Sequence, residues 1–249
     1  MTRLPALVAA LFSFWALAPA RSADPAPDAP LKIHMIAFGE YSPVETLTEF
    51  KDFLEKTYRV EITTSFGGNG SKLEGLDGLP KAELLVLFAR RMQLKDEQMK
   101  IIRAHWDQGK PIIGLRTACH AFQKDDNAII DRKVFGGNYG GGPSSNGGFK
   151  TTVPAGAEQH PVLKDVGTIK ASKYAYGQGE LAEGVTVLHT AKALKGETIP
   201  VTFVNTYNGG RMLYSSLGAP DDFKDESFRK LLVNAVFWAT KRDVERMKK

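Results

Sequence analysis

Apolar runs of strand length alternate with amphipathic segments through the first half of the chain. Four such runs predict strands, at residues 31–38 (LKIHMIAF), 60–66 (VEITTSF), 83–89 (ELLVLFA) and 111–115 (PIIGL). Near-continuous apolar runs are typical of strands that are buried on both faces of a parallel sheet. Helical spacing recurs between them, at Leu47, Phe50 and Leu54 and again at Met99, Ile102 and Trp106. This alternation predicts a parallel sheet with helices on both faces.

Cap and stop residues mark the ends of the two predicted helices. Ser42, Pro43 and Glu45 have the spacing of a capping box, with a serine cap and a proline at the first helical position. They predict a helix that begins at Pro43 and is capped by the Ser42 side chain. Gly109 is the expected end of the second helix.

The second half of the chain predicts a different arrangement. Strands are expected near 185–189 and 199–204, and Asn208-Gly209-Gly210 is a hairpin turn that leads into RMLYSSL. An amphipathic helix over 227–240 closes the chain. With no internal repeat, these elements predict one α/β domain over residues 31–249, with a mainly parallel sheet and a C-terminal antiparallel hairpin.

The first thirty residues have the layout of an export signal. Arg3 precedes a largely apolar run from Leu4 to Leu17, and Ala18-Pro19-Ala20 is a small-x-small cleavage pattern. We therefore expect a signal peptide over 1–23, a Pro/Ala linker over 24–30, and a periplasmic or secreted protein. The alternative is an uncleaved anchor, but the apolar run is short for a membrane span, so no stable membrane insertion is expected.

Charge and cysteine content limit the partners. The formal net charge is +5, and the positive residues are mixed with acidic ones, which indicates solubility and attraction to acidic ligands and argues against nucleic-acid binding. The single cysteine, Cys119, excludes an internal disulfide. No histidine pair has metal-ligand spacing, and the Gly-rich loop GGNYGGGPSSNGG lacks the ending of a phosphate-binding loop. We expect no metal, no cofactor, and a chain compatible with a homo-oligomer.

The candidate site lies at the carboxyl ends of the predicted parallel strands, where open sheets bind their ligands. Glu40 follows the first strand, Arg90 the third, and Arg116, Thr117 and His120 the fourth. Most charges in exposed loops are simply solvated. Arg90 and Arg116, however, come directly after buried strands, so their guanidinium groups are expected to point into the crevice and bind an oxygen or an anion.

Cys119 and His120 invite a second interpretation as a nucleophile and its base. A nucleophile elbow lies directly at the strand-to-helix turn, and that position is Arg116. Cys119 falls about one helical turn later, where neighbouring side chains diverge, so we interpret it as a packing residue. His120 has two readings, either an acid, base or ligand hydrogen-bonder, or a structural cap of a nearby carbonyl.

Three other features can be interpreted from the residues alone. The Gly-rich loop is either a lid, with Asn138 and Tyr139 as its polar and stacking groups, or a surface loop. His34 lies inside the first strand and is expected to be a core residue. His105, on a helix, is expected at the surface.

Five segments carry a family resemblance: PIIGLRTACHAF, DRKVFGGNYGG, HPVL, GGRMLYSSLGAPDDF and FRKLLVNAVFWA. In their order and spacing they resemble the ThuA-like proteins, from about Leu31 to Thr240. The resemblance implies the fold of class I glutamine amidotransferases, a flavodoxin-like three-layer sandwich. It also implies a role in carbohydrate metabolism, including the processing of oxidised sugars, since the family is named for trehalose utilisation.

The resemblance also bears on single positions. The amidotransferase nucleophile corresponds to Arg116, so glutamine hydrolysis is not expected. Many relatives carry a histidine where this chain has Ala219, and another after the Gly-Asn-Tyr loop, where this chain has glycines. The candidates that survive the comparison are Glu40, Arg90, Arg116, His120, Asn138, Tyr139, His160 and the pair Asp221-Asp222, of which Asp222 is expected to bind substrate.

Three functions follow as hypotheses. In the first, the chain acts on a small carbohydrate or oxidised sugar, with Arg116 and Arg90 holding an oxygen, His120 carrying a proton and Glu40 orienting it or acting as base. In the second, it binds sugar without catalysis, which Ala219 favours. In the third, it is a cysteine hydrolase or glyoxalase of the DJ-1 type, with Glu40 supporting Cys119.

Overall fold

The computed structural model describes residues 29–67, 71–143, 145 and 147–249. The predicted signal peptide and most of the predicted linker therefore lie outside the described residues. No helix within the described ranges is long and apolar enough to cross a bilayer.

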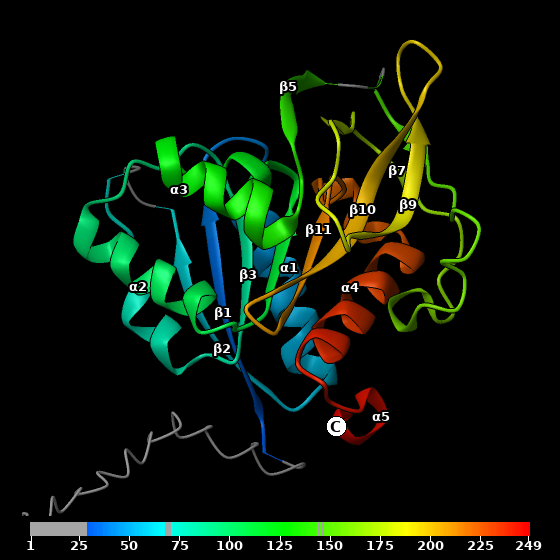
Figure 1. Cartoon of the computed structure of the whole chain (residues 1–249). Coiled ribbons are helices and arrows are strands. Elements are labelled where there is room, and N and C mark those ends of the chain that lie inside the picture. The colour runs from blue at the N-terminus through cyan, green and yellow to red at the C-terminus, as the bar shows by residue number, and fades with distance from the viewer. Residues whose placement is uncertain (1–28, 68–70, 144, 146) are drawn as a thin grey trace, which may run out of the picture.

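A seven-stranded sheet forms the centre of the molecule (Figure 1), in the order β2-β1-β3-β4-β11-β10-β9. Its strands are β1 (Leu31–Phe38), β2 (Val60–Phe66), β3 (Leu84–Ala89), β4 (Ile112–Leu115), β9 (Thr186–Lys192), β10 (Thr198–Tyr207) and β11 (Gly210–Ser215). Strands β1 to β4 pair in parallel with one another and β11 pairs in parallel with β4, whereas β10 pairs antiparallel with both β11 and β9. The mainly parallel α/β fold and its C-terminal antiparallel hairpin are therefore confirmed.

Helices cover both faces of this sheet, as the alternation of runs predicts. The α-helices are α1 (Pro43–Thr57), α2 (Asp96–Asp107), α3 (Lys124–Ala128), α4 (Glu226–Ala239) and α5 (Val244–Met247). Tighter or wider turns are η1 (Leu76–Lys81), η2 (Arg116–His120), η3 (Ile129–Phe135, a π-helix), η4 (Pro161–Leu163) and η5 (Pro220–Lys224). Figure 1 shows α1 and α4 against one face and α2 and α3 against the other.

The side chains on the two faces of each central strand pack into separate hydrophobic cores. Ile33 and Met35 of β1 pack with the apolar stripes of α1 and α4, whereas Ile36 packs on the opposite side with α2 and the turns η2 and η3. Burying fully apolar strands on both faces stabilises each strand by roughly 2 kcal/mol per large side chain. This pattern produces the three layers.

One local prediction is wrong. Ser42 does not cap α1, because its own backbone is left-handed (φ 57°) and its side chain makes no cap hydrogen bond. Part of the Gly-rich loop forms the strand β5 (Tyr139–Pro143), which pairs with β8 (Tyr176–Gln178) in a two-stranded ribbon. A second small ribbon joins β6 (Phe149–Lys150) to β7 (Lys170–Ala171).

The buried histidines are also informative. His34 bonds Thr63 and Ser65, as expected of a core residue. His105 is buried with Nε2 on the Pro111 carbonyl oxygen at 3.1 Å, so its predicted surface position is wrong. His189 is fully buried, and neither ring nitrogen has a hydrogen-bond partner. Burial lowers the pKa of all three imidazoles to about 4.

Acid should therefore destabilise the fold, and His189→Leu should weaken that effect. The folded-state pKa lies below the unfolded value near 6.5, so full stability is present above that value and is lost as pH falls toward 4. Between pH 6.5 and 5, His189 alone removes roughly 1–2 kcal/mol. Urea midpoints from pH 7.5 to 5 test this. Burial raises the pKa of Asp131 to about 6, so this residue stabilises the fold as pH falls, and it does so equally in the parent and in His189→Leu. Equal pH slopes for parent and variant would contradict the assignment.

Candidate functional site

Arg116 lies at the turn where β4 ends and η2 begins. Its backbone is left-handed (φ 47°), which is strained for a residue with a side chain. The Tyr214 hydroxyl holds this turn by donating to the Arg116 carbonyl oxygen at 2.7 Å. The strained turn therefore lies at Arg116, the predicted elbow position. The Arg116 side chain is not exposed, however, because only 1% of the residue is accessible to solvent.

The Arg116 guanidinium sits within a tyrosine cage, which we define as Tyr41, Tyr174 and Tyr176. The ring centroids lie 5.6, 5.5 and 5.3 Å from Cζ in that order. Nη1 donates to the Ser216 carbonyl oxygen in a long contact of 3.4 Å, while Nε and Nη2 are buried without a partner. No carboxylate of the described residues forms an ion pair with it. A buried cation with two unused donors is arranged to receive an oxygen ligand.

Two tyrosines of the cage come from a segment that the strand and helix patterns do not reveal. Tyr176 is the first residue of β8 and Tyr174 lies just before it, and the Tyr176 backbone N–H donates to Ser216 Oγ at 2.8 Å. Tyr41 follows β1 in a strained turn of its own (φ 76°). The Tyr-x-Tyr spacing in KYAYGQ is the only sequence signal that could have pointed to this pair.

His120 lies beside the cage at the end of η2 and is 6% exposed. Its ring stacks on Tyr139 at 4.4 Å and meets the edge of Tyr176 at 5.3 Å. Burial, together with the positive charges of Arg90 and Arg91, lowers the pKa of His120 to about 4. His120 is therefore neutral at neutral pH and can accept a proton or a hydrogen bond.

Cys119 is in contact with His120, contrary to the expected divergence of neighbouring side chains. Sγ lies 3.2 Å from His120 Nδ1 and 3.2 Å from the Tyr214 hydroxyl oxygen, because η2 is a tight 3₁₀ turn. The thiol is 1% exposed, and burial raises its pKa well above the ordinary range. A buried, protonated thiol is a poor nucleophile, which supports the packing interpretation.

Glu40 and Arg90 form an ion pair at 3.0 Å on the rim of the site, with 64% and 26% of their side chains exposed. The Glu40 carboxylate is thus engaged by Arg90, and no hydrogen bond links it to His120 in the described structure. Thr117 is fully buried in η2 with its hydroxyl unpaired. These residues share one edge of the sheet, as predicted, although Glu40 is not placed to orient His120.

The ribbon β5–β8 carries the two candidates from the Gly-rich loop. The Asn138 backbone N–H donates to Gln178 Oε1 at 2.8 Å, and the Tyr139 N–H donates to Asp131 Oδ2 at 2.9 Å. Through Tyr139, which stacks on His120, the ribbon covers the site. Asp131 and Gln178 support it from below and are residues that the sequence reasoning missed.

The structure gives Asp222 and His160 other positions. Both carboxylate oxygens of Asp222 are occupied by four donors, namely the backbone N–H and hydroxyl of Ser172 and the backbone N–H groups of Gly218 and Ala219. Asp222 therefore holds the loops behind the cage and has no free oxygen for a substrate. His160 packs against Trp238 at 5.2 Å, and the Trp238 ring also faces Arg211, at the amino end of β11. It lies at the opposite edge of the sheet from Arg116.

Comparisons with known proteins agree with this architecture. The sequence profile of the ThuA family, described as trehalose utilisation, matches residues 37–239. The chain belongs to the ThuA family. A ThuA-like protein from Bacteroides uniformis is 18% identical, with a TM-score of 0.65 over 89% of this chain and 95% of that one. One from Parabacteroides merdae is 17% identical, with a TM-score of 0.67 over 85% and 90%.

A wider fold similarity reaches other proteins. A cold-adapted β-galactosidase from Rahnella sp. R3 is 15% identical with a TM-score of 0.55, and the match covers 86% of this chain but 32% of that enzyme. At such identities the likeness shows the fold alone. Among proteins with curated descriptions, none matches the chain.

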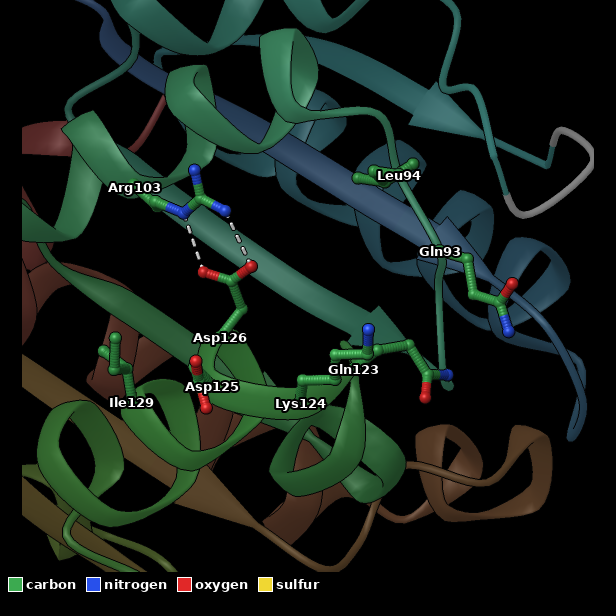
Figure 2. A pocket seen from close by; sticks show the side chains of 8 residues that line it. All are labelled: Gln93, Leu94, Arg103, Gln123, Lys124, Asp125, Asp126 and Ile129. Carbon is green, nitrogen blue, oxygen red and sulfur yellow. Dashed lines mark hydrogen bonds and ion pairs between the residues drawn. The ribbon is translucent and has the colours of Figure 1, made fainter.

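An open pocket of this ThuA-family chain lies beside the site and is not lined by Arg116. Figure 2 shows this pocket of about 650 Å³, between the segment after β3 and the start of α3. At its back, Arg103 donates to both oxygens of Asp126, at 2.7 and 2.8 Å. Because its strongest polar groups are satisfied by each other, we place the site at Arg116, where donors are unused. No group of three or more potential metal ligands gathers anywhere in the described ranges.

Proposed function

We propose that this ThuA-family chain binds and acts on a small carbohydrate or an oxidised sugar in saccharide catabolism, and that it has no glutamine amidotransferase activity. One observation carries the proposal. The strained elbow, where amidotransferases of this fold place their nucleophile, is occupied by Arg116, whose Nε and Nη2 are unpaired. The family's description as trehalose utilisation supports the carbohydrate class.

Each group in the site has a chemical role under this proposal. Arg116 holds or polarises an oxygen of the sugar, since a charged donor in a buried site binds more strongly than in water. The tyrosine cage supplies flat apolar surfaces that match the faces of a sugar ring. His120, neutral at neutral pH, accepts a proton from the sugar and returns it. Arg90 keeps the rim positive beside it.

A second function, sugar binding without catalysis, is favoured by specific observations. The Glu40 carboxylate is paired with Arg90, so His120 has no acidic partner among the described residues. Position 219, where many relatives carry a histidine, is an alanine with no acid or base to offer. His120 replacement separates the two functions. The cysteine hydrolase hypothesis receives no support from this geometry, because Cys119 is buried and Glu40 contacts Arg90.

Arg116→Ala should remove sugar binding. We expect the parent chain to melt at a higher temperature in the presence of a sugar, or of its keto or acid derivative, because ligand binding stabilises the folded state. The variant should lose that shift, since its oxygen-binding donors are gone. A thermal-shift screen against these compounds measures both. His120→Ala should keep most of the shift and lose any turnover.

Arg91→Lys is the matched control, because it changes an exposed side chain near the same edge and keeps the positive charge beside His120. It should bind sugars as the parent does. A full ligand-induced shift in folded Arg116→Ala would contradict the proposal, and turnover that survives His120→Ala would remove the proton-carrier role.

A further inference from the structure

The unused donors of Arg116 lie on one edge of its guanidinium. Nη1 is turned toward the Ser216 carbonyl oxygen, and the two buried nitrogens without a partner are Nε and Nη2. In a guanidinium, one N–H group of each of these two nitrogens points in the same direction from one lateral edge of the planar group. That edge matches the two oxygens of a carboxylate, which accept one hydrogen bond each.

The uncompensated charge of Arg116 also favours an anionic ligand. The side chain is 1% exposed, and the tyrosine cage offsets only part of the desolvation of a full positive charge. Nearby carboxylates are engaged elsewhere, since Glu40 pairs with Arg90 and Asp222 receives four donors. A neutral ligand would leave this buried charge uncompensated, whereas an anion completes it.

A further polar atom is available beside this edge. The Tyr176 hydroxyl is buried among the side chains of Tyr41 and Tyr174 and makes no hydrogen bond of ordinary geometry, and its ring lies 5.3 Å from Arg116 Cζ. A buried hydroxyl without a partner destabilises the ligand-free protein, and a ligand hydroxyl can satisfy it. The site thus offers a carboxylate edge and at least one position for a sugar hydroxyl.

We propose that the ligand of this site is a sugar acid whose carboxylate binds side-on to Nε and Nη2 of Arg116, with a ring or chain hydroxyl on Tyr176. The proposal rests on the proposed function for the carbohydrate part and adds the anionic group. The route to the edge passes Tyr41, which is 38% exposed and lies in a turn with three left-handed residues, Gly39, Tyr41 and Ser42. Tyr41 is the exposed member of the cage, and its ring centroid lies 5.6 Å from Arg116 Cζ.

Calorimetric titration of the whole chain tests this with five probes: gluconate, glucuronate, the neutral methyl ester of glucuronate, glucose and lactate. We expect the two sugar acids to bind at least tenfold more tightly than the ester and glucose, because only they carry the carboxylate. Lactate, a carboxylate without the sugar, should bind at least tenfold more weakly than gluconate.

Three variants locate the binding. Arg116→Lys keeps the charge but loses the two-donor edge, so affinity for the sugar acids should fall at least tenfold. Tyr176→Phe removes only an unpaired hydroxyl, so it should fold normally and weaken sugar acids several-fold. Arg91→Lys, a conservative change of an exposed arginine in a left-handed turn, is the control and should bind as the parent does.

The outcomes separate this inference from the proposed function. If the methyl ester binds as tightly as glucuronate, the carboxylate inference is overturned and the carbohydrate function stands. If lactate binds as tightly as gluconate and depends on Arg116, carboxylate recognition stands and the carbohydrate function fails. Sugar-acid binding that is unchanged in folded Arg116→Lys and in Tyr176→Phe overturns the assigned position.

Discussion

Asp222→Ala should be among the most destabilising single substitutions in the chain. The fully buried carboxylate accepts hydrogen bonds from Ser172 N and Oγ at 2.7 and 2.8 Å, and from Gly218 N and Ala219 N at 2.8 and 2.9 Å. Alanine leaves four donors without their acceptor, and the expected loss is about 4 kcal/mol of unfolding free energy. Urea denaturation measures it, and the melting temperature should fall by roughly 10 °C.

The same substitution should weaken ligand binding indirectly. Ser172 precedes Tyr174 of the cage, and Gly218 follows the segment whose Ser216 carbonyl oxygen receives Arg116 Nη1. Loss of the carboxylate loosens both loops, so the cage no longer holds the guanidinium in one position. The loss of affinity should therefore occur together with the loss of stability. A loss of affinity in a variant of unchanged stability is not expected.

Asp221→Ala is the matched control for Asp222. Its carboxylate is 60% exposed and pairs with Lys224, which is 74% exposed, and such surface pairs contribute little to stability. The urea midpoint of this variant should therefore match that of the parent. If Asp222→Ala lost binding with its stability intact, the carboxylate would be a ligand contact, as the sequence resemblance suggested, and its supporting role would be wrong.

Much of the fold could be predicted because the signals are local. Continuous apolar runs such as LKIHMIAF and ELLVLFA match β1 and β3 to within a residue, since a strand buried on both faces admits few polar side chains. Asn208-Gly209 gives the turn of the β10–β11 hairpin because both residues adopt positive φ (48° and 80°). The position of Arg116 followed from counting along a strand whose end was already clear.

The cage could not be predicted because its members come together only through long-range contacts. Tyr41 follows the first strand, whereas Tyr174 and Tyr176 come from a segment about 130 residues later with no helical or strand periodicity. The Ser42 cap failed for a related reason, since the strained turn after β1 places Tyr41 over Arg116 and leaves Ser42 left-handed. Here the tertiary arrangement overrides a local capping signal.

Asp222 and His160 show a different limit. Both are polar residues within motifs of the resemblance, and a motif does not distinguish a ligand contact from a support. In the structure, one organises loops behind the site and the other packs on Trp238 at the far edge. Polar residues that satisfy buried backbone groups are as much a part of a fold as its apolar core.

Gly109→Ala should also destabilise the chain strongly, because Gly109 lies in a close contact between two turns at the amino ends of the strands. Gly109 ends α2 with φ 67°, and a Cβ placed there would lie 2.1 Å from the Asn208 carbonyl oxygen. A Cβ on Gly210 would likewise lie 2.1 Å from the Gly109 carbonyl oxygen, so the two turns touch backbone to backbone. Left-handed strain of about 1–2 kcal/mol and forced separation of the turns, about 1–3 kcal/mol more, should lower stability by roughly 4 kcal/mol in urea denaturation.

Gly209→Ala isolates the contribution of backbone conformation to this loss. Gly209 has a similar φ of 80° in the same turn, but a Cβ there meets nothing within 4 Å, so this variant should lose only about 1–2 kcal/mol. Equal losses in the two variants would show that the close contact of the turns does not matter. Because the two turns precede β4 and β11, whereas Arg116 and Ser216 follow those strands, folded Gly109→Ala should bind its ligand with the parent's affinity. Stability and affinity should thus fall together at Asp222 and separate at Gly109, as expected if the sheet places packing at its amino edge and recognition at its carboxyl edge.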